Sequence, residues 1–268
     1  MAHRLQTPGH DDTQAGDECI LMIFRQFETA DGELSYLLAD PVTGAAALID
    51  PDLVALERYR SALAESGLSL RYVLETHLHE SHVSAAPWLR DSAAARVAMS
   101  DCADAVCIDQ RLQDGDELYV GEETLTAIAT PGHSACSMVY RWRDRLFTGH
   151  TLLVGAAGDT RRDDAAPERL YSSVVDQLYR LPGDLLVYPG RVVEGRRVSS
   201  IAQERQTNAT LNHRSQRDDF IAARRADRRT LAAAAAQRLQ LNRECRYDAT
   251  PEFSSHKPTE QGNHHADM

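Results

Sequence analysis

The sequence lacks three features that would assign it to particular classes of protein. Its five cysteines are an odd number at scattered positions, so they do not indicate a disulfide framework, and a reducing cytoplasm is the expected compartment. No apolar run approaches the roughly 18 residues of a membrane-spanning helix, and the polar residues 1–17 show no secretory signal. An excess of positive charge is also lacking. The net charge is −11, which argues against a nucleic-acid-binding surface.

The composition that is present is ordinary for a globular protein. Hydrophobic residues make up 43% and charged residues 26% of the 268 residues, enough to bury a sizeable core in one large domain or two small ones. The polar segments 1–16 and 246–268 are predicted to be disordered. Between them, 17–245 is predicted to form one folded domain that ends in a helical extension.

The spacing of apolar residues predicts a strand-rich first half and a mixed second half. Turn signals at 31–33 and 40–44 separate short apolar runs, which predicts an antiparallel meander at the start. The expected elements are, in order, strands 20–24, 34–39 and 45–49, helix 52–66, strand 70–74, helix 83–92, strands 96–99, 116–120, 124–128, 137–142 and 145–148, helix 167–181, strand 185–188 and helix 221–241. We therefore expect two sheets packed face to face with helices outside.

Three histidines, His77, His79 and His82, fall within six residues directly after the expected strand 70–74. A strand that ends in a short loop can aim two imidazoles at one point. Neutral imidazole is a common protein ligand of zinc, iron and related metals. The cluster therefore predicts a metal site, with further ligands arriving from other strand ends.

Polar side chains also follow three later strands, each directly after a glycine. These are His133, His150 and Arg191. A glycine lets the backbone turn sharply and approach its neighbours closely. We therefore predict that these strand ends bring His133, His150 and Arg191 to the same edge of the fold as the histidine cluster.

The order and spacing of these motifs resemble the metallo-β-lactamase superfamily, and within it the branch of glyoxalase II and the persulfide (sulfur) dioxygenases. The resemblance spans residues 19–212 and is carried by the motifs that begin at Thr76-His77, at Thr130-Pro131-Gly132-His133, at Phe147-Thr148-Gly149 and at Leu181-Pro182-Gly183. Segments 170–173 and 201–208 are more similar to the dioxygenases than to the hydrolytic glyoxalases. The resemblance implies an α/β (α+β) fold, the αβ/βα four-layer sandwich, with the metal at one edge of the two sheets.

Three positions depart from the superfamily pattern. Ser81 stands where an aspartate usually precedes the last histidine of the first motif, His150 where an aspartate ligand usually follows Thr-Gly, and Arg191 where a histidine is usual. A second cation would lack carboxylate charge and would lie near Arg191, so we predict one metal per chain. His82, Ser81 and Asp50 are expected to lie behind the ligands and not on the metal.

The persulfide dioxygenases hold a single Fe(II) at the positions of His77, His133 and His150. The resemblance therefore implies these three histidines as the metal ligands, with His79 as a possible fourth ligand. Fe(II) is therefore the implied cofactor, with zinc as the alternative because a third histidine replaces the carboxylate. The implied function is the oxidation of a persulfide or thiol sulfur by O2. Two alternatives stay open: a thioester metallohydrolase similar to glyoxalase II, and a catalytically degenerate protein that keeps the fold.

Arg191, Tyr171 and Arg161 are the expected contacts of a small sulfur-containing substrate. By resemblance, the enzymes that act on glutathione persulfide carry an arginine at the position of Asp159, so this substrate is in doubt here. No nucleic acid and no membrane is expected as a partner. The amphipathic C-terminal helix leaves a homodimer open.

Overall fold

The computed structural model describes residues 23–227 and 229–247. The segment 1–16, predicted to be disordered, lies outside these residues, and so does 246–268 except for its first two residues. The expected strand 20–24 falls mostly outside them as well. No helix within the described residues is both long and apolar enough to cross a bilayer.

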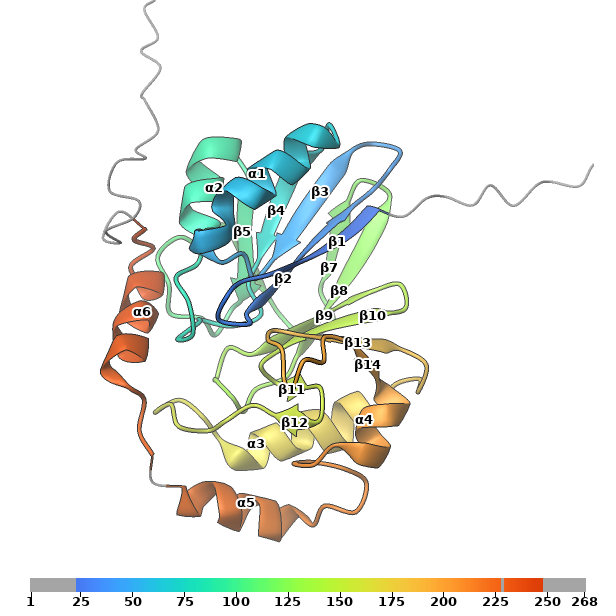
Figure 1. The fold of residues 1–268 in the computed structure, drawn as a ribbon, viewed down its shortest axis with the longest axis vertical. Helices are drawn as coiled ribbons and strands as arrows, with labels where there is room; N and C mark the ends of the chain where they lie inside the picture. The colour runs from blue at the N-terminus through green and yellow to red at the C-terminus, as the bar shows by residue number, and fades with distance from the viewer. Residues whose placement is uncertain (1–22, 228, 248–268) are drawn as a thin grey trace, which may run out of the picture.

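Among the described residues, two six-stranded sheets pack face to face and carry helices on their outer faces (Figure 1). The first sheet contains, in spatial order, β1 (Ile23–Glu28), β2 (Leu34–Ala39), β3 (Ala45–Ile49), β4 (Ser69–Leu74), β5 (Arg96–Ser100) and β6 (Gln110–Leu112). The second contains β14 (Ser199–Ser200), β13 (Leu186–Pro189), β10 (Arg145–Gly149), β9 (Met138–Trp142), β8 (Glu123–Ala129) and β7 (Glu117–Val120). The predicted four-layer sandwich is confirmed.

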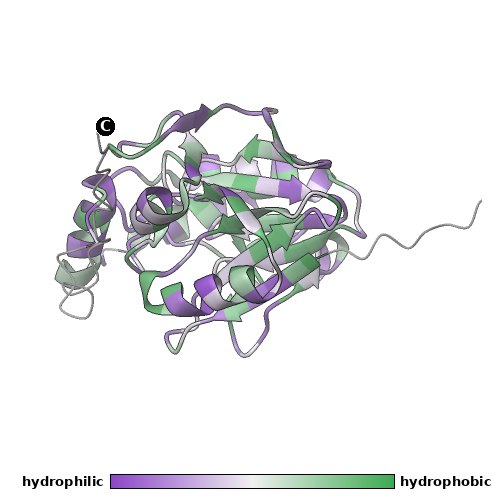
Figure 2. Cartoon of the chain, turned by 90° about the horizontal axis from the view of Figure 1, so that it is seen from above, coloured by the Kyte–Doolittle hydropathy of each residue, from purple (hydrophilic) through white to green (hydrophobic). Residues whose placement is uncertain are grey.

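The main core lies between the two sheets. Leu38, Ile49 and Leu74 of the first sheet belong to the same buried cluster as Trp142 and Phe147 of the second. Strands β2 and β3 are buried along their whole length, because helices cover the outer face of the first sheet. Burial on both faces explains why these segments are continuous apolar runs and do not alternate with polar residues. Seen from above, the strands are the most hydrophobic part of the fold, whereas the outer helices carry hydrophilic faces (Figure 2).

Helices cover both sheets and close the outer layers. The first sheet carries α1 (Leu56–Glu65), which follows a short 3-10 turn at Leu53–Ala55, and α2 (Ala86–Ala93). The second sheet carries α3 (Pro167–Tyr171), which continues through Ser172–Gln177 and Leu178–Arg180, then α4 (Ile201–Thr207) and α5 (Arg217–Ala226). The expected helices 52–66, 83–92 and 167–181 are thus confirmed.

The single helix expected over 221–241 is wrong: the chain forms α5 and a separate α6 (Ala233–Arg243). Asp227 ends α5 in an extended conformation, and its carboxylate accepts hydrogen bonds from the backbone N–H and from Nε of Arg229. The alanine-rich sequence favours a helix throughout, but these local bonds stabilise a break.

The short strands β6, β11 (Leu152–Leu153), β12 (Ala156–Ala157) and β14 were also not expected, because two or three residues are too few to show a pattern.

The cysteines gave no indication of a disulfide, and that expectation is wrong for one pair. Cys107 and Cys245 form a disulfide with a Cα–Cα distance of 5.8 Å, across a sequence separation of 138 residues. Cys102 and Cys136 are free. The disulfide ties the end of α6 to the segment that follows β5.

Candidate metal centre

Three histidines from separate strand ends converge at one edge of the sandwich. His77 follows β4, His133 follows β8 and His150 follows β10. Their ring centroids lie between 4.8 and 5.2 Å apart, and all three side chains are buried. This set, called the histidine triad below, is the ligand set that the family resemblance implied.

Two glycines allow the strand ends to approach each other this closely. Gly149 has a φ of +49°, and a Cβ at this position would collide with the side chain of Thr76 at the end of β4. A Cβ on Gly190 would lie 2.9 Å from Cδ2 of His150. Only glycine fits such contacts without displacing its neighbours. The glycines therefore bring the ends of β4, β10 and β13 together.

Hydrogen bonds from Nδ1 leave the Nε2 lone pair of His77 and of His133 available to bind a metal. The Thr76 hydroxyl donates to Asp50 at 2.7 Å, so its oxygen accepts the proton of His77 Nδ1, 3.0 Å away. His133 Nδ1 donates to the carbonyl oxygen of Asp159 at 3.0 Å. The Nε2 atoms of His77, His133 and His150 are all buried, and none has a hydrogen-bond partner within residues 23–227 and 229–247. Buried, partnerless nitrogens that face one another fit a bound metal ion.

Burial also keeps His77 in the form that binds a metal. Desolvation, reinforced by the neighbouring histidines, lowers the pKa of His77 well below its usual value, so the ring is neutral at pH 7. A neutral imidazole with Nδ1 protonated presents its Nε2 lone pair to a cation. The group behind it, Asp50 acting through Thr76, orients the ring as is usual for metal-binding histidines.

His79 is arranged differently from the triad. Its Nε2 lies 3.1 Å from an Asp50 oxygen and 2.9 Å from a Glu75 oxygen, whereas its buried Nδ1 has no partner in the described part of the chain. Burial alone would lower the pKa of His79, but the charge and hydrogen bond of Asp50, together with Glu75, hold it well above its usual value. His79 therefore forms a second group with two carboxylates, next to the triad.

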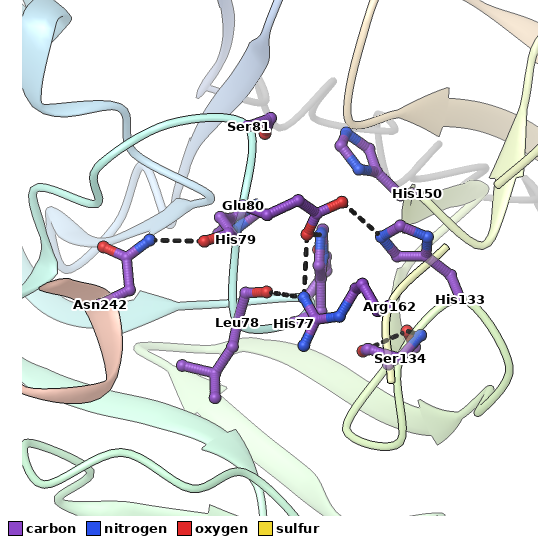
Figure 3. A network of polar contacts seen from close by, with 12 residues as sticks. His77, Leu78, His79, Glu80, Ser81, His133, Ser134, His150, Arg162 and Asn242 are labelled. Carbon is purple, nitrogen blue, oxygen red and sulfur yellow. Dashed lines mark hydrogen bonds and ion pairs between the residues drawn. The ribbon is translucent and has the colours of Figure 1, made fainter. Parts of the chain in front are cut away.

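Glu80 adds a carboxylate to the triad, and no motif predicted it (Figure 3). Its Oε1 lies 3.3 Å from Nε2 of His133, and its Oε2 lies 4.0 Å from Nε2 of His77. One ligand atom from each of Glu80 and the three histidines falls within 4.8 Å of the others. The buried guanidinium of Arg162 donates to Glu80 Oε2 at 2.9 Å.

A second unexpected carboxylate, Glu33, lies in the space between Ser81, His82, His150 and Arg191, where the sequence predicts that no second metal binds. Its Oε2 accepts a hydrogen bond from Ser81 at 2.9 Å and lies 3.6 Å from Nδ1 of His82 and 3.5 Å from Nε2 of His150. Its other oxygen lies 3.7 Å from Nε of Arg191. The expectation that this space lacks carboxylate charge is therefore wrong, but the cation paired with Glu33 is Arg191.

A cleft of about 570 Å³ opens onto the triad. Arg161, Arg191 and Arg238 line it together with His133, His150, Glu80 and residues of α6. Arg161 forms an ion pair with Asp159. A volume of this size suits a small molecule, and the arginines favour one that carries negative charge.

Tyr171, expected to contact substrate, lies away from this cleft. Its hydroxyl donates to the carbonyl oxygen of Ser215 at 3.0 Å, and its ring packs near Phe220 and under the guanidinium of Arg217. These contacts join α3 to α5 in the outer helical layer. Of the three expected substrate contacts, the structure lines the cleft with Arg161 and Arg191.

Helix α6 holds the loop that carries the histidine cluster. The Asn242 amide donates to the carbonyl oxygens of His79 and His82 at 2.8 and 2.9 Å, and its oxygen accepts from the N–H of Ser84 at 2.9 Å. The Cys107–Cys245 disulfide anchors the same end of α6. Side chains far apart in the sequence therefore fix the shape of residues 79–84.

Cys245→Ser is expected to loosen this loop, because it releases the end of α6 that carries Asn242. Hydrogen–deuterium exchange should show faster exchange of the amides of 79–84 in the variant and in the reduced wild type. Loss of the disulfide should also lower the free energy of unfolding by about 2–4 kcal/mol. The matched control is Cys102→Ser, which removes an exposed free thiol. Unchanged exchange in 79–84 of Cys245→Ser would show that α6 does not hold the loop.

Four contributors to the site were missed: Glu33, Glu80, Arg162 and Asn242. Glu80 could have been suspected, because it lies inside the histidine motif and a carboxylate is a common metal ligand. Arg162 directly follows Arg161, the arginine that the sequence predicts as a substrate contact. Glu33 and Asn242 reach the site from positions 48 and 158 residues away from their hydrogen-bond partners Ser81 and Ser84, and no local pattern marks them.

A sandwich with a buried histidine cluster at one sheet edge defines the chain as a metal-binding protein of the αβ/βα class. Residues 29–191 match the family description of the metallo-beta-lactamase superfamily. The chain belongs to this superfamily.

Relatives of known type come from two groups within it. The chain is 30% identical to the mitochondrial persulfide dioxygenase ETHE1 of Homo sapiens over 200 residues, which cover 74% of this chain and 79% of that protein. It is 35% identical to a hydroxyacylglutathione hydrolase of Methylobacterium nodulans over 205 residues, 72% of this chain and 78% of that one. The crystal structure of ETHE1 from Myxococcus xanthus superposes with a TM-score of 0.80 at 36% identity, covering 84% of this chain and 100% of that chain.

Proposed function

We propose that this protein is a mononuclear iron-dependent oxidoreductase that oxidises the sulfur of a persulfide or thiol with O2. The observation that carries the proposal is the histidine triad with its buried, partnerless Nε2 atoms. Similarity to persulfide dioxygenases over three quarters of the chain supports the reaction class. Zinc is the alternative metal.

The pairing of Arg191 with Glu33 supports a single metal. In the superfamily's second site a cation would have to displace the guanidinium that already faces this carboxylate at 3.7 Å. A second divalent ion beside Arg191 would bring three positive charges around the single buried carboxylate of Glu33, which repel one another. One iron per chain is therefore the expected stoichiometry.

The residues of this chain would bind, orient and shield the reactants. His77, His133 and His150 would hold the iron, and bound Fe(II) would supply the electron-transfer chemistry that lets O2 react with sulfur. Arg191 at the cleft wall would orient an anionic substrate. Both atoms of O2 pass to the terminal sulfur, so R–S–SH becomes R–S–SO2H while that sulfur loses four electrons and O2 gains them.

Hydrolysis of a thioester is the second function that the relatives support, because the chain is 35% identical to a hydroxyacylglutathione hydrolase. Such a reaction needs a metal-activated water and no O2. The two functions therefore differ in a directly measurable requirement.

The test is metal content and O2 uptake of protein purified without oxygen. We expect about one iron per chain and O2 consumption that depends on a persulfide. Glutathione persulfide, cysteine persulfide and simple thiols should be compared, since Arg161 is tied to Asp159 in this chain. Two metals per chain, with thioester hydrolysis and no O2 uptake, would overturn the proposal in favour of the hydrolase.

A further inference from the structure

The carboxylate of Glu80 enters the histidine triad from the loop that also carries His77. Its side chain is 10% exposed, and its two oxygens face in different directions. Oε2 accepts from Arg162, whereas Oε1 faces Nε2 of His133 at 3.3 Å (Figure 3). Because His133 Nδ1 donates to the Asp159 carbonyl, two lone pairs face each other across this gap when the ring is neutral. Two facing acceptors call for a proton or a metal ion between them. Ligand atoms of His77 and His150 lie within 4.8 Å of both, which completes a set that fits a metal ion.

We propose that Glu80 is the carboxylate ligand of this metal centre and that Arg162 is the residue that positions it. The inference rests on the metal centre of the proposed function, and it adds a fourth ligand that comes from a different loop than residue 150. His150 stands where an aspartate ligand is usual, so it cannot supply a carboxylate to the metal. Glu80 would supply that carboxylate instead.

The charge of the centre supports this assignment. A divalent ion held by three neutral imidazoles alone carries its full double charge in a buried site, and a carboxylate halves it. Arg162 does not cancel this benefit, because Asp164 offsets its charge: Nε of Arg162 donates to Oδ1 of Asp164 at 2.8 Å, and Nη2 to Oδ2 at 3.1 Å. The charge of Glu80 is therefore left to compensate the metal.

Arg162 has the contacts of a positioning residue. Its side chain is 1% exposed, and its Nη1 donates to both the Leu78 carbonyl oxygen and Glu80 Oε2. One arginine nitrogen thus fixes the backbone before Glu80 and the Glu80 carboxylate together. Oε2 is held by Arg162 and lies 4.0 Å from Nε2 of His77, whereas Oε1 has no such donor and lies 3.3 Å from Nε2 of His133. Oε1 is therefore the oxygen that would bind the metal, as a monodentate ligand.

The first experiment measures metal affinity and not turnover. Wild type, Glu80→Gln and the surface control Glu122→Gln are titrated anaerobically with Fe(II) against a competing chelator. The absorption spectrum of each Co(II)-loaded protein is also recorded, because it reports the ligand set. Loss of the hydrogen-bond partner of a metal ligand already costs 10–100-fold in metal affinity. Glu80→Gln removes a proposed ligand, so it should weaken Fe(II) binding by at least about 100-fold and change the Co(II) spectrum. Affinity and spectrum equal to wild type would overturn the proposal.

Arg162→Gln separates the ligand role from a merely structural ion pair. It keeps Glu80 but releases its carboxylate, so we expect a loss in Fe(II) affinity of about tenfold, smaller than that of Glu80→Gln. If Glu80 served only to pair with Arg162, both variants would bind Fe(II) as wild type does. An equal loss in both variants would likewise speak against a direct ligand.

The double variant Glu80→Gln/His150→Asp tests whether the carboxylate is interchangeable between the two loops. It restores one carboxylate and two histidines to the centre, so its Fe(II) affinity should recover at least tenfold over Glu80→Gln. No recovery in a folded double variant would contradict the proposal.

A wild type that binds iron but consumes no O2 would refute the proposed function and leave this test intact. A wild type that binds no divalent metal would overturn the ligand assignment itself.

Discussion

His77→Ala is expected to abolish metal binding and to reduce O2 uptake by at least about a thousandfold, because this ring lies at the centre of the site. Its centroid lies 4.9 Å from that of His133 and 4.8 Å from that of His150. The remaining ligands, His133, His150 and the proposed Glu80, would have to bind the metal without the ring that lies nearest to both other histidines. Removing the hydrogen-bond partner of a metal ligand costs 10–100-fold in metal affinity. Removing His77, which is itself a ligand, should therefore lower the affinity by more.

The measurements are iron content after anaerobic purification, O2 uptake with a persulfide and the far-ultraviolet circular dichroism spectrum. His213→Ala is the matched control, since this histidine is exposed and pairs only with the carbonyl of Arg205 and with Arg214 among the described residues. The control should keep the iron and the activity of wild type. A folded His77→Ala protein that retains about one iron per chain would show that the triad is not the metal site.

The positions of the triad histidines could be predicted from the sequence because two local signals coincide. Each histidine follows a strand, and strands of a sandwich that run in the same direction end at one edge. At His133 and His150 a glycine precedes the ligand, and Gly149 does adopt the left-handed conformation that this signal indicates. The signals are short-range and needed no knowledge of which strands pair.

The environment of the triad could not be predicted, because it is built from contacts between segments distant in sequence. Glu33 comes from the start of β2, and its neighbour Arg191 from the end of β13. Asn242 reaches the histidine loop only because the chain breaks after α5, where Asp227 binds Arg229. An uninterrupted helix over 221–241, which propensity favours, would have carried Asn242 elsewhere. The helix propensity of 221–241 was outweighed by the hydrogen-bonded turn at Asp227 and by the Cys107–Cys245 disulfide.

Asp50→Ala is expected to destabilise the fold by about 3–5 kcal/mol, because it leaves several buried groups without partners. The Asp50 carboxylate accepts hydrogen bonds from the N–H and the hydroxyl of Thr76, each at 2.7 Å, and contacts His79 Nε2 at 3.1 Å. Urea denaturation should show this loss. The exposed Asp184 provides the control, and Asp184→Asn should unfold at the urea concentration of wild type.

Asp50→Asn is expected to separate stability from metal binding. Asparagine tolerates the φ of +49° at this position, and its oxygen can still accept from the N–H of Thr76. Its NH2 group would donate to the Thr76 hydroxyl, which must then turn its proton toward His77 Nδ1. The His77 proton would move to Nε2, the nitrogen that faces the metal. We therefore expect a folded protein whose Fe(II) affinity is about 10–100-fold weaker, measured by chelator competition. Wild-type affinity in this variant would mean that the tautomer of His77 does not depend on Asp50.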